Sequence, residues 1–424
     1  MPEFDHHTVE FAQNWRSIYA GLRRGCPVAH TTEHGGFYVI SRYDDVKRVL
    51  QDPGNFSNGR DFEFGGELRT GFGGITIPPT PVRMGMLEMD PPQSQAYRRI
   101  LAPAFSAKAI RAYRPRMAQI IAWAVDRVIE SGRIDFIDDL ANPVPALISL
   151  DLIGLPLGKW QSYAVALHQA AYREKGSARA IGKLVTDVRD YIGQRRAATG
   201  HDSPADVIQL LLTAQVDEAG LDDAMVTELV FMLLNGGIDT STALIANMFR
   251  YLGEHRDYRA RLAADPGLIP AAVDEMLRYF TPGTGIARTA TNDVEVAGTR
   301  LCPGDRLLLA LGSANNDEAV FAAPDEVDLD RDNAGRHLAF GYGIHRCLGA
   351  FLAPAEMALL LEEVLRRMPG YEIDLAGTVR YPTIPIVNGY IAMPATFTPG
   401  PRVLAGERSD LPPAAGCCPP GDRP

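Results

Sequence analysis

Hydrophobic residues recur at helical spacing along most of this chain. Periods near 3.6 residues run from Glu10 to Leu22, from Tyr43 to Leu50 and, with polar breaks, from Ile120 to about Ala198. A further helix is expected over Ser203 to Gln215, and the longest pattern begins at Leu221 and continues to about Gly253. The chain is therefore expected to be mostly helical.

Short stretches that alternate with a period of two lie between these helices. Gly36 to Arg42 predicts a strand, as do the alternating positions Val294, Val296 and Leu301. The segment Val387 to Phe397 predicts a terminal hairpin. Together with the helical periods, these stretches predict a mostly α fold with small β-sheets.

Two segments rich in glycine or proline lack either period. The stretch from Gly59 to Pro81 predicts a mobile loop, and no Lys-Ser or Lys-Thr pair follows it, which argues against a phosphate-binding loop. The tail over residues 399–424 is rich in Pro, Gly and Ala and predicts disorder. We expect one domain over residues 1–398, followed by this tail.

Composition and charge narrow the class of partners. A formal charge of −10 and a pI of about 5.4 argue against nonspecific binding to nucleic acid or to an anionic membrane. Five irregularly spaced cysteines fit a reducing cytosol rather than a disulfide framework. The first residues lack the basic and apolar regions of a secretory signal, and the apolar stretch 141–157 is interrupted by Pro143, Pro145 and Asp151. We expect a soluble, cytoplasmic protein.

One glycine-rich stretch, from His337 to Ala350, surrounds a single cysteine. Three glycines near Cys347 predict a tight turn, because glycine is favoured where the backbone takes positive φ or lies against a bulky group. The helical pattern resumes at Leu348, so Cys347 is expected at a helix N-terminus, where the dipole lowers the pKa of a thiol. Such a thiol suits metal ligation or nucleophilic attack.

Two other interpretations of Cys347 remain open on its position alone. A buried structural thiol would need only the turn. A cysteine hydrolase would need a base, and His345 lies two residues away in a turn, which rarely presents a base to a nucleophile well.

The complete motif is longer than either interpretation requires. It comprises Phe340, Gly341, Gly343, His345, Cys347 and Gly349. This run resembles the haem-binding loop of the haem-thiolate monooxygenases, the cytochromes P-450, and specifically their soluble bacterial type. The resemblance implies haem b ligated by the Cys347 thiolate, with Phe340 beside the sulfur and the haem between a long central helix and the cysteine loop.

The longest predicted helix contains Gly236, Gly237, Asp239 and Thr240 in one short run. Each mid-helix glycine costs about 1 kcal/mol relative to alanine, so close helix packing is one explanation for the pair. The run also resembles the family's element in which the glycines leave a groove for dioxygen. By that resemblance, the Asp239 carboxyl and the Thr240 hydroxyl deliver protons.

Further matches to the family concern charged residues. Glu275 and Arg278 lie on one helix face, and with Arg331 they resemble the family's buried charge triad. The haem propionates are expected to bind Arg98, Arg288, His337 and His345. Two departures are Ser94, where the family commonly has histidine, and Pro354, where it often has arginine; Pro354 is expected to remove a helix hydrogen bond and kink the helix.

A substrate pocket and a docking surface are expected on either side of the haem. The pocket is expected to include Met232, Asn235, Gly236, Thr284 and Ile286, with Asn235 as a polar group for a hydrogen-bonding substrate. Between Pro91 and Val125 the charged residues are all basic: Arg98, Arg99, Lys108, Arg111, Arg114 and Arg116. This stretch predicts either a solvated basic face or a docking surface for an acidic partner.

The function implied by the resemblance is insertion of one atom of O2 into a C–H bond of a small, largely apolar substrate. Electrons would come from a ferredoxin and its NAD(P)H-dependent reductase. Alternatives are a peroxygenase that uses H2O2, against which the Asp239-Thr240 pair argues, and a non-catalytic haem or lipid carrier. His168 is interpreted as structural because it has no second ligand at i+4.

Overall fold

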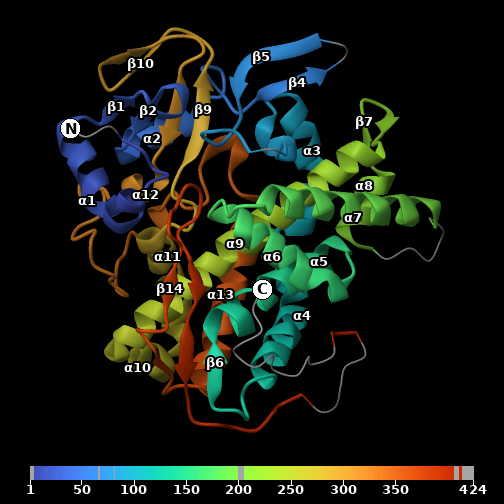
Figure 1. The fold of residues 1–424 in the computed structure, drawn as a ribbon, viewed down its shortest axis with the longest axis vertical. Helices are drawn as coiled ribbons and strands as arrows, with labels where there is room; N and C mark the ends of the chain where they lie inside the picture. The colour runs from blue at the N-terminus through green and yellow to red at the C-terminus, as the bar shows by residue number, and fades with distance from the viewer. Residues whose placement is uncertain (1–3, 65–66, 81, 199–204, 405–409, 413–424) are drawn as a thin grey trace.

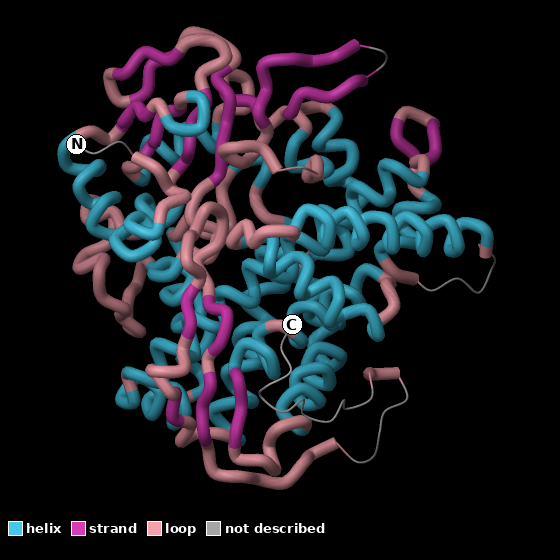
Figure 2. Tube along the Cα trace, in the orientation of Figure 1, coloured by secondary structure: helices cyan, strands magenta, loops and turns pink. Residues whose placement is uncertain are grey.

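The computed structural model describes residues 4–64, 67–80, 82–198, 205–404 and 410–412, without the side chains of residues 61–72. Most of the strands lie at the top of the view in Figure 1, above a larger helical region. Figure 2 shows the same division by secondary structure. The mostly helical fold with small sheets follows the pattern of the sequence.

A single long helix, α9 (Asp223–Glu254), runs through the helical region. Asp222 caps its start by accepting the N–H of Met225, and apolar side chains cover nearly every face, as expected for a helix enclosed by others. It packs against α5 (Pro143–Ile153), α6 (Trp160–Ala171) and α7 (Ser177–Ala197). By length and apolarity α9 could cross a membrane, but 78% of its apolar window is buried inside the protein, as in a core helix.

The main sheet has five strands in the order β1, β2, β12, β9 and β3. Their bounds are Val28–Thr31, Phe37–Ile40, Arg306–Leu309, Ile286–Ala290 and Phe56–Ser57. The central pair β2–β12 is parallel and the other pairs are antiparallel. Strand β9 therefore lies inside the sheet, which fixes the position of Arg288 at its centre.

The remaining elements surround these two parts. The other helices are α1 (Val9–Gly25), α2 (Tyr43–Gln51), α3 (Gln93–Leu101), α4 (Ala107–Asp126), α8 (Val207–Thr213), α10 (Arg256–Ala264), α11 (Ile269–Phe280), α12 (Leu311–Ala314) and α13 (Leu352–Arg367). The small sheets pair β4 (Arg60–Phe64) with β5 (Glu67–Gly73), β7 (Gln215–Val216) with β8 (Ala219–Gly220), β10 (Val294–Val296) with β11 (Thr299–Leu301), β14 (Val379–Arg380) with β15 (Tyr390–Ala392), and β16 (Pro394–Thr396) with both β6 (Arg133–Asp135) and β13 (Glu372–Ile373).

Three sequence expectations are wrong in the structure. The terminal hairpin does not form, because β15 pairs with β14 while β16 pairs with β6 and β13. The glycine-rich stretch is not one loop, since β4 and β5 form an antiparallel ribbon; residues 65–66 and 81 lie outside the described part. The start of the tail is ordered: the Val403 and Leu404 N–H groups donate to Asp126. Residues 405–409 and 413–424 lie outside the described residues.

Candidate active site

The turn around Cys347 depends on two glycines with positive φ. Gly341 has φ +64° and Gly343 has φ +73°. A Cβ at Gly343 would lie 2.5 Å from the carbonyl oxygen of Leu50, so a larger residue would collide with the backbone of α2. The Cys347 N–H donates to the Phe340 carbonyl at 2.9 Å, which closes the turn and sets the direction of the sulfur.

The surroundings of the Cys347 sulfur disfavour its charge. Although part of the residue is accessible, burial raises the pKa of the Cys347 thiol, and the hydrogen bond from Gly349 and the charges of Arg98 and Arg346 offset this only in part. The expected lowered pKa is therefore wrong for the protein alone. A short 3-10 turn, Leu348–Ala350, separates the cysteine from α13, so the α-helix dipole does not begin at Cys347.

Two arginines and a histidine lie near this cysteine. Arg288 on β9 is 2% exposed, donates to the Ala287 carbonyl at 2.7 Å, and has its pKa lowered to about 10 by burial. Burial, and then the charges of Arg288 and Arg98, lower the pKa of His345 to about 3, and His345 Nε2 is buried without a hydrogen-bond partner among the described residues. The presence of Arg288, Arg98 and a neutral His345 in one place therefore indicates a binding site for an anionic group.

The remaining proposed propionate residues are arranged differently from one another. Arg98 on α3 donates to the Arg346 carbonyl at 2.5 Å, and burial lowers the pKa of Arg98. One turn earlier, Ser94 Oγ is buried and lacks a partner. His337 instead faces the protein, because its Nδ1 accepts the Ala339 N–H at 3.2 Å and its Nε2 lies 3.9 Å from Asp274. The structure therefore gives His337 no free nitrogen for a propionate.

Gly236 and Gly237 of α9 face different surroundings. A Cβ at Gly237 would lie 2.7 Å from Ser149 Oγ on α5, so Gly237 allows close helix packing. A Cβ at Gly236 would meet nothing within 4 Å, and Gly236 is exposed although α9 is otherwise mostly buried. Of the pair, Gly236 faces the open space and Gly237 does not.

The next turn of α9 carries the acid and the alcohol. The Thr240 hydroxyl donates to the Gly236 carbonyl at 2.8 Å, within the same helix. Asp239 is 5% exposed, and its Oδ1 lies 3.2 Å from His168 Nδ1 and 3.3 Å from the Tyr381 hydroxyl. Asp239 Oδ2 is buried without a partner.

His168 and Tyr381 were missed as site residues by the sequence analysis. His168 lies on α6 and Tyr381 directly follows β14, and the Tyr381 hydroxyl is 2.7 Å from His168 Nδ1. Burial, and then the charge of Asp239, raise the pKa of Tyr381 well above its usual value, so its hydroxyl stays protonated. Neither residue has a local sequence signal, because their partner lies far away along the chain.

The predicted pocket residues lie on α9, on β9 and in the loop before β9. Met232 is buried on α9 against Gly85, and Asn235 is half-buried directly before Gly236. Thr284 is 3% exposed, and its N–H donates to the Ile386 carbonyl at 3.2 Å. Ile286 begins β9, two residues before Arg288, and is half-buried.

The charged residues Glu275, Arg278 and Arg331 come together in the interior. Arg278 donates twice to Glu275 at 2.7 Å, and Arg331 Nε lies 3.0 Å from Glu275 Oε2. Arg278 also donates to three backbone carbonyls, so the charges are hydrogen-bonded as buried charges must be. This network fixes the segment that leads to the Cys347 turn.

The basic stretch on α3 and α4 is only partly free. Arg116 is paired with Asp151 at 2.7 Å and with Asp410 at 2.6 Å. Arg99, Lys108 and Arg111 are exposed, and the turn between α3 and α4 contacts the residues directly after Cys347. A positive surface therefore borders the cysteine loop.

Comparison with known proteins identifies the family. The family model for cytochrome P-450 matches residues 267–378. Steroid C26-monooxygenase from Mycobacterium tuberculosis is 32% identical over 395 residues, which cover 91% of this chain and 94% of the relative. The chain belongs to the cytochrome P-450 family. It is an oxidoreductase of the monooxygenase class, and the cofactor of the family is haem b.

Other relatives and solved structures agree with this P-450 assignment. The 6-deoxyerythronolide B hydroxylase from Saccharopolyspora erythraea is 30% identical over 88% of this chain and 93% of its own. A mutant of P-450 EryK in complex with erythromycin B has a TM-score of 0.81 at 28% identity, covering 94% of this chain and 100% of its own. A P-450 from Bacillus megaterium in complex with testosterone has a TM-score of 0.80 at 27% identity, with 92% and 99% covered.

The residues near Cys347 fit haem b. Its two propionates need charge-assisted donors, and Arg288, Arg98 and the unpaired His345 Nε2 supply them. A thiol whose pKa is raised by burial becomes a thiolate when it coordinates a metal, so iron supplies the positive charge that the protein lacks there.

The expected effect of Pro354 is wrong. Helix α13 begins at Leu352, so Pro354 occupies the third helical position, where the N–H has no partner within the helix. Proline there removes no helical hydrogen bond. This departure from the family pattern therefore leaves the start of α13 intact.

Proposed function

We propose that this P-450 inserts one atom of O2 into a C–H bond of a largely apolar organic substrate, with electrons from a ferredoxin and an NAD(P)H-dependent reductase. The observation that carries the proposal is the convergence of Arg98 and Arg288 on an unpaired, neutral His345 beside Cys347. These groups match one cofactor with one sulfur ligand and two carboxylates.

When bound there, the haem supplies oxygen activation. Cys347 would supply the thiolate ligand, Phe340 and Gly349 would flank the sulfur, and the glycine turn would position the loop that holds the cofactor. Arg98, Arg288 and His345 hold the propionates. Gly236 leaves room for dioxygen on the side of α9 where a side chain would project.

Proton supply is assigned to α9. Asp239 Oδ2, which has no partner, would exchange protons, while His168 and Tyr381 hold the other carboxylate oxygen in place. The Thr240 hydroxyl, already directed along the helix to Gly236, would orient the proton donor.

The substrate is proposed to be a small, mostly apolar organic molecule with one hydrogen-bonding group near Asn235. Curated relatives include a steroid C26-monooxygenase and a 6-deoxyerythronolide B hydroxylase, so steroids and macrolide-type lactones are the first compounds to screen. Met232, Thr284 and Ile286 are the pocket residues that we expect to contact such compounds. The cytoplasm is the compartment in which we expect ferredoxin-dependent turnover.

The test combines the absorption spectrum of the CO complex with an assay of product formation. The reduced protein with CO should show the red-shifted Soret band that is diagnostic of the family, and Cys347→Ser should abolish it. Compounds that shift the haem spin state are then assayed for product with a ferredoxin system and, separately, with H2O2. Retention of the band in the variant would remove Cys347 as ligand, and product formation with H2O2 alone would support the peroxygenase alternative.

A further inference from the structure

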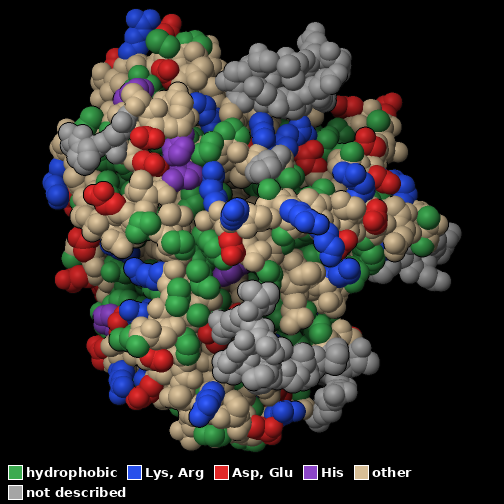
Figure 3. All heavy atoms as spheres, in the orientation of Figure 1, with side chains coloured by type: hydrophobic (Ala, Val, Ile, Leu, Met, Phe, Trp, Pro, Cys, Tyr) green, Lys and Arg blue, Asp and Glu red, His purple; other side chains and the backbone are tan. Residues whose placement is uncertain are grey.

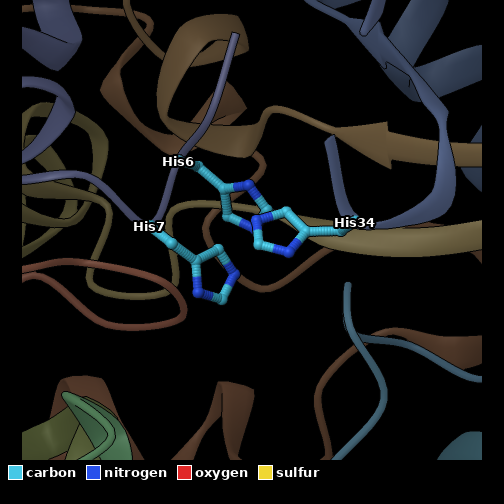
Figure 4. A group of neighbouring side chains, drawn as sticks. All are labelled: His6, His7 and His34. Carbon is cyan, nitrogen blue, oxygen red and sulfur yellow. The ribbon is translucent and has the colours of Figure 1, made fainter. Parts of the chain in front are cut away.

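Three histidines from two distant parts of the chain meet next to the N-terminal segment. His6 and His7 precede α1, and His34 lies in the short 3-10 turn Glu33–Gly35 between β1 and β2. Each contributes one ring nitrogen to a group in which these atoms all lie within 4.8 Å of one another. Figure 4 shows the three rings directed toward a common point, and Figure 3 shows histidine side chains on this face of the protein.

The hydrogen bonds of the outer two rings leave one nitrogen of each available. His7 Nε2 lies 2.8 Å from the Ile77 carbonyl oxygen and His34 Nε2 lies 2.9 Å from Asp5 Oδ1, and both oxygens can only accept. The protons therefore sit on Nε2, and the lone pairs sit on Nδ1. Metal-ligating histidines commonly donate their second N–H to a carbonyl or carboxylate in this way.

The third ring is the most enclosed of the group. His6 is 3% exposed, and its Nδ1 is buried without a hydrogen-bond partner in the part of the chain that the structure describes. A buried polar atom without a partner is costly, and a bound cation would satisfy it.

From these contacts we propose that His6, His7 and His34 bind one divalent transition-metal ion of the Zn²⁺ class, with water at the fourth position. Imidazole suits Zn, Cu and Ni, and three histidines with one open position form a known type of zinc site. Nitrogens around tetrahedral Zn²⁺ lie roughly 3.3 Å apart for Zn–N distances of about 2.0–2.1 Å. Small rotations of the two outer rings, which are not fully buried, close the present separation.

The local charges and strain are consistent with a built site. The Asp5 carboxylate contacts His34 at 2.9 Å, and its negative charge opposes the positive charge of Arg173 near the group. His34 holds φ at +50°, a conformation that residues other than glycine adopt rarely and that positions its ring in the group. His7 Nε2 contacts the Ile77 carbonyl at 2.8 Å, so the ion would join the N-terminal segment and the turn after β1 to residue 77.

The test is calorimetric titration of Zn²⁺ into the haem-loaded, full-length protein after removal of other metals with EDTA. We expect one ion per chain and a rise in melting temperature with Zn²⁺. His34→Asn tolerates the positive φ but lacks the imidazole, so it should weaken binding at least tenfold and abolish the thermal shift. His7→Gln should weaken binding similarly, and it provides a second variant if His34→Asn folds poorly.

The matched control is His30→Asn, which changes an exposed histidine on β1 outside the group. It should bind Zn²⁺ like the wild type. Absence of binding by the wild type would overturn the proposal. Equal, weak binding by all four proteins would mean an adventitious ion only, and would overturn it as well.

Discussion

His168 Nδ1 lies 3.2 Å from Asp239 Oδ1 although the two residues are 71 positions apart, on α6 and α9. The Tyr381 hydroxyl lies 2.7 Å from the same nitrogen and 3.3 Å from the same oxygen. The carboxyl that we assign to proton delivery is thus held from two other segments. Movement of α6 would therefore change the position of Asp239.

Loss of this support should lower the turnover number more than substrate affinity. His168→Leu removes both contacts of Nδ1, so Asp239 loses its fixed orientation, and we expect kcat to fall roughly tenfold with KM nearly unchanged. His168→Gln can still donate to Asp239 and should recover most of the rate. Equal kcat in wild type and His168→Leu, at saturating substrate and ferredoxin, would show that the contact is only structural.

Substitution of Asp239 and substitution of Thr240 should have different effects, the first on the rate of product formation and the second on the product formed per NAD(P)H consumed. Asp239→Asn removes the proton donor and should slow product formation by roughly 10²-fold, since general acid-base groups contribute about 10²–10⁴-fold. Thr240→Ala should continue to oxidise NAD(P)H while releasing H2O2 in place of product. Product and H2O2 are measured per NAD(P)H consumed. If coupling is unchanged in both variants, the assignment of Asp239 and Thr240 fails.

Haem retention should depend on the two inward-facing arginines. Arg98→Ala or Arg288→Ala leaves a propionate without its charge-assisted donor, so the haem-to-protein ratio after purification should fall severalfold. Arg99→Ala is the matched control, because Arg99 is exposed on the same helix as Arg98. Full occupancy in both inward variants would contradict the propionate assignment.

Reduction by a ferredoxin should depend on the basic surface beside the cysteine loop. Arg111→Glu and Arg114→Glu reverse charges on α4 and should slow reduction roughly tenfold at low salt while flattening its salt dependence. Arg189→Glu, at an exposed position on α7, should have no effect. Rates from stopped-flow mixing that do not differ among the three variants would leave this surface as a solvated basic face.

The free energy of unfolding should decrease as the pH rises, because one buried carboxyl must ionise. Burial raises the pKa of Glu356 on α13 from 4.5 to about 8, so the folded protein retains a proton that the unfolded chain releases above about pH 4.5. The favourable contribution is complete below pH 4.5 and is lost as the pH rises toward about 8, at a cost of roughly 2–5 kcal/mol. Glu356→Gln cannot ionise and should be the more stable protein at pH 8.5 but not at pH 5, as measured by urea unfolding.

Much of this protein follows from the sequence alone. The helical periods predict α1, α2 and α9 to within a few residues, because a face or a whole surface of each helix must be apolar to be buried. The glycine spacing around Cys347 predicts the turn, because only glycine takes φ +73° against the backbone of α2. These are local requirements, and local sequence satisfies them.

Other features depend on which segments meet. The final strands could not be assigned to their sheets, because β15 pairs with β14 whereas β16 pairs with β6 and β13, which lie far away along the chain or come before β14. The direction of the Cys347 pKa depends on burial by distant residues, so the helix position alone predicted it wrongly. The different roles of Gly236 and Gly237 depend on whether α5 or open space lies opposite.

The sequence by itself determined the family, the cysteine turn and the positions of the acid and the alcohol. Only the tertiary structure decided that His168 and Tyr381 hold Asp239, that His337 faces Asp274, and that three histidines from two segments form one group. The physical reason is the separation along the chain of the residues that interact. Turns and helices arise from interactions within a few residues, whereas these contacts join residues that are neighbours only after the chain has folded.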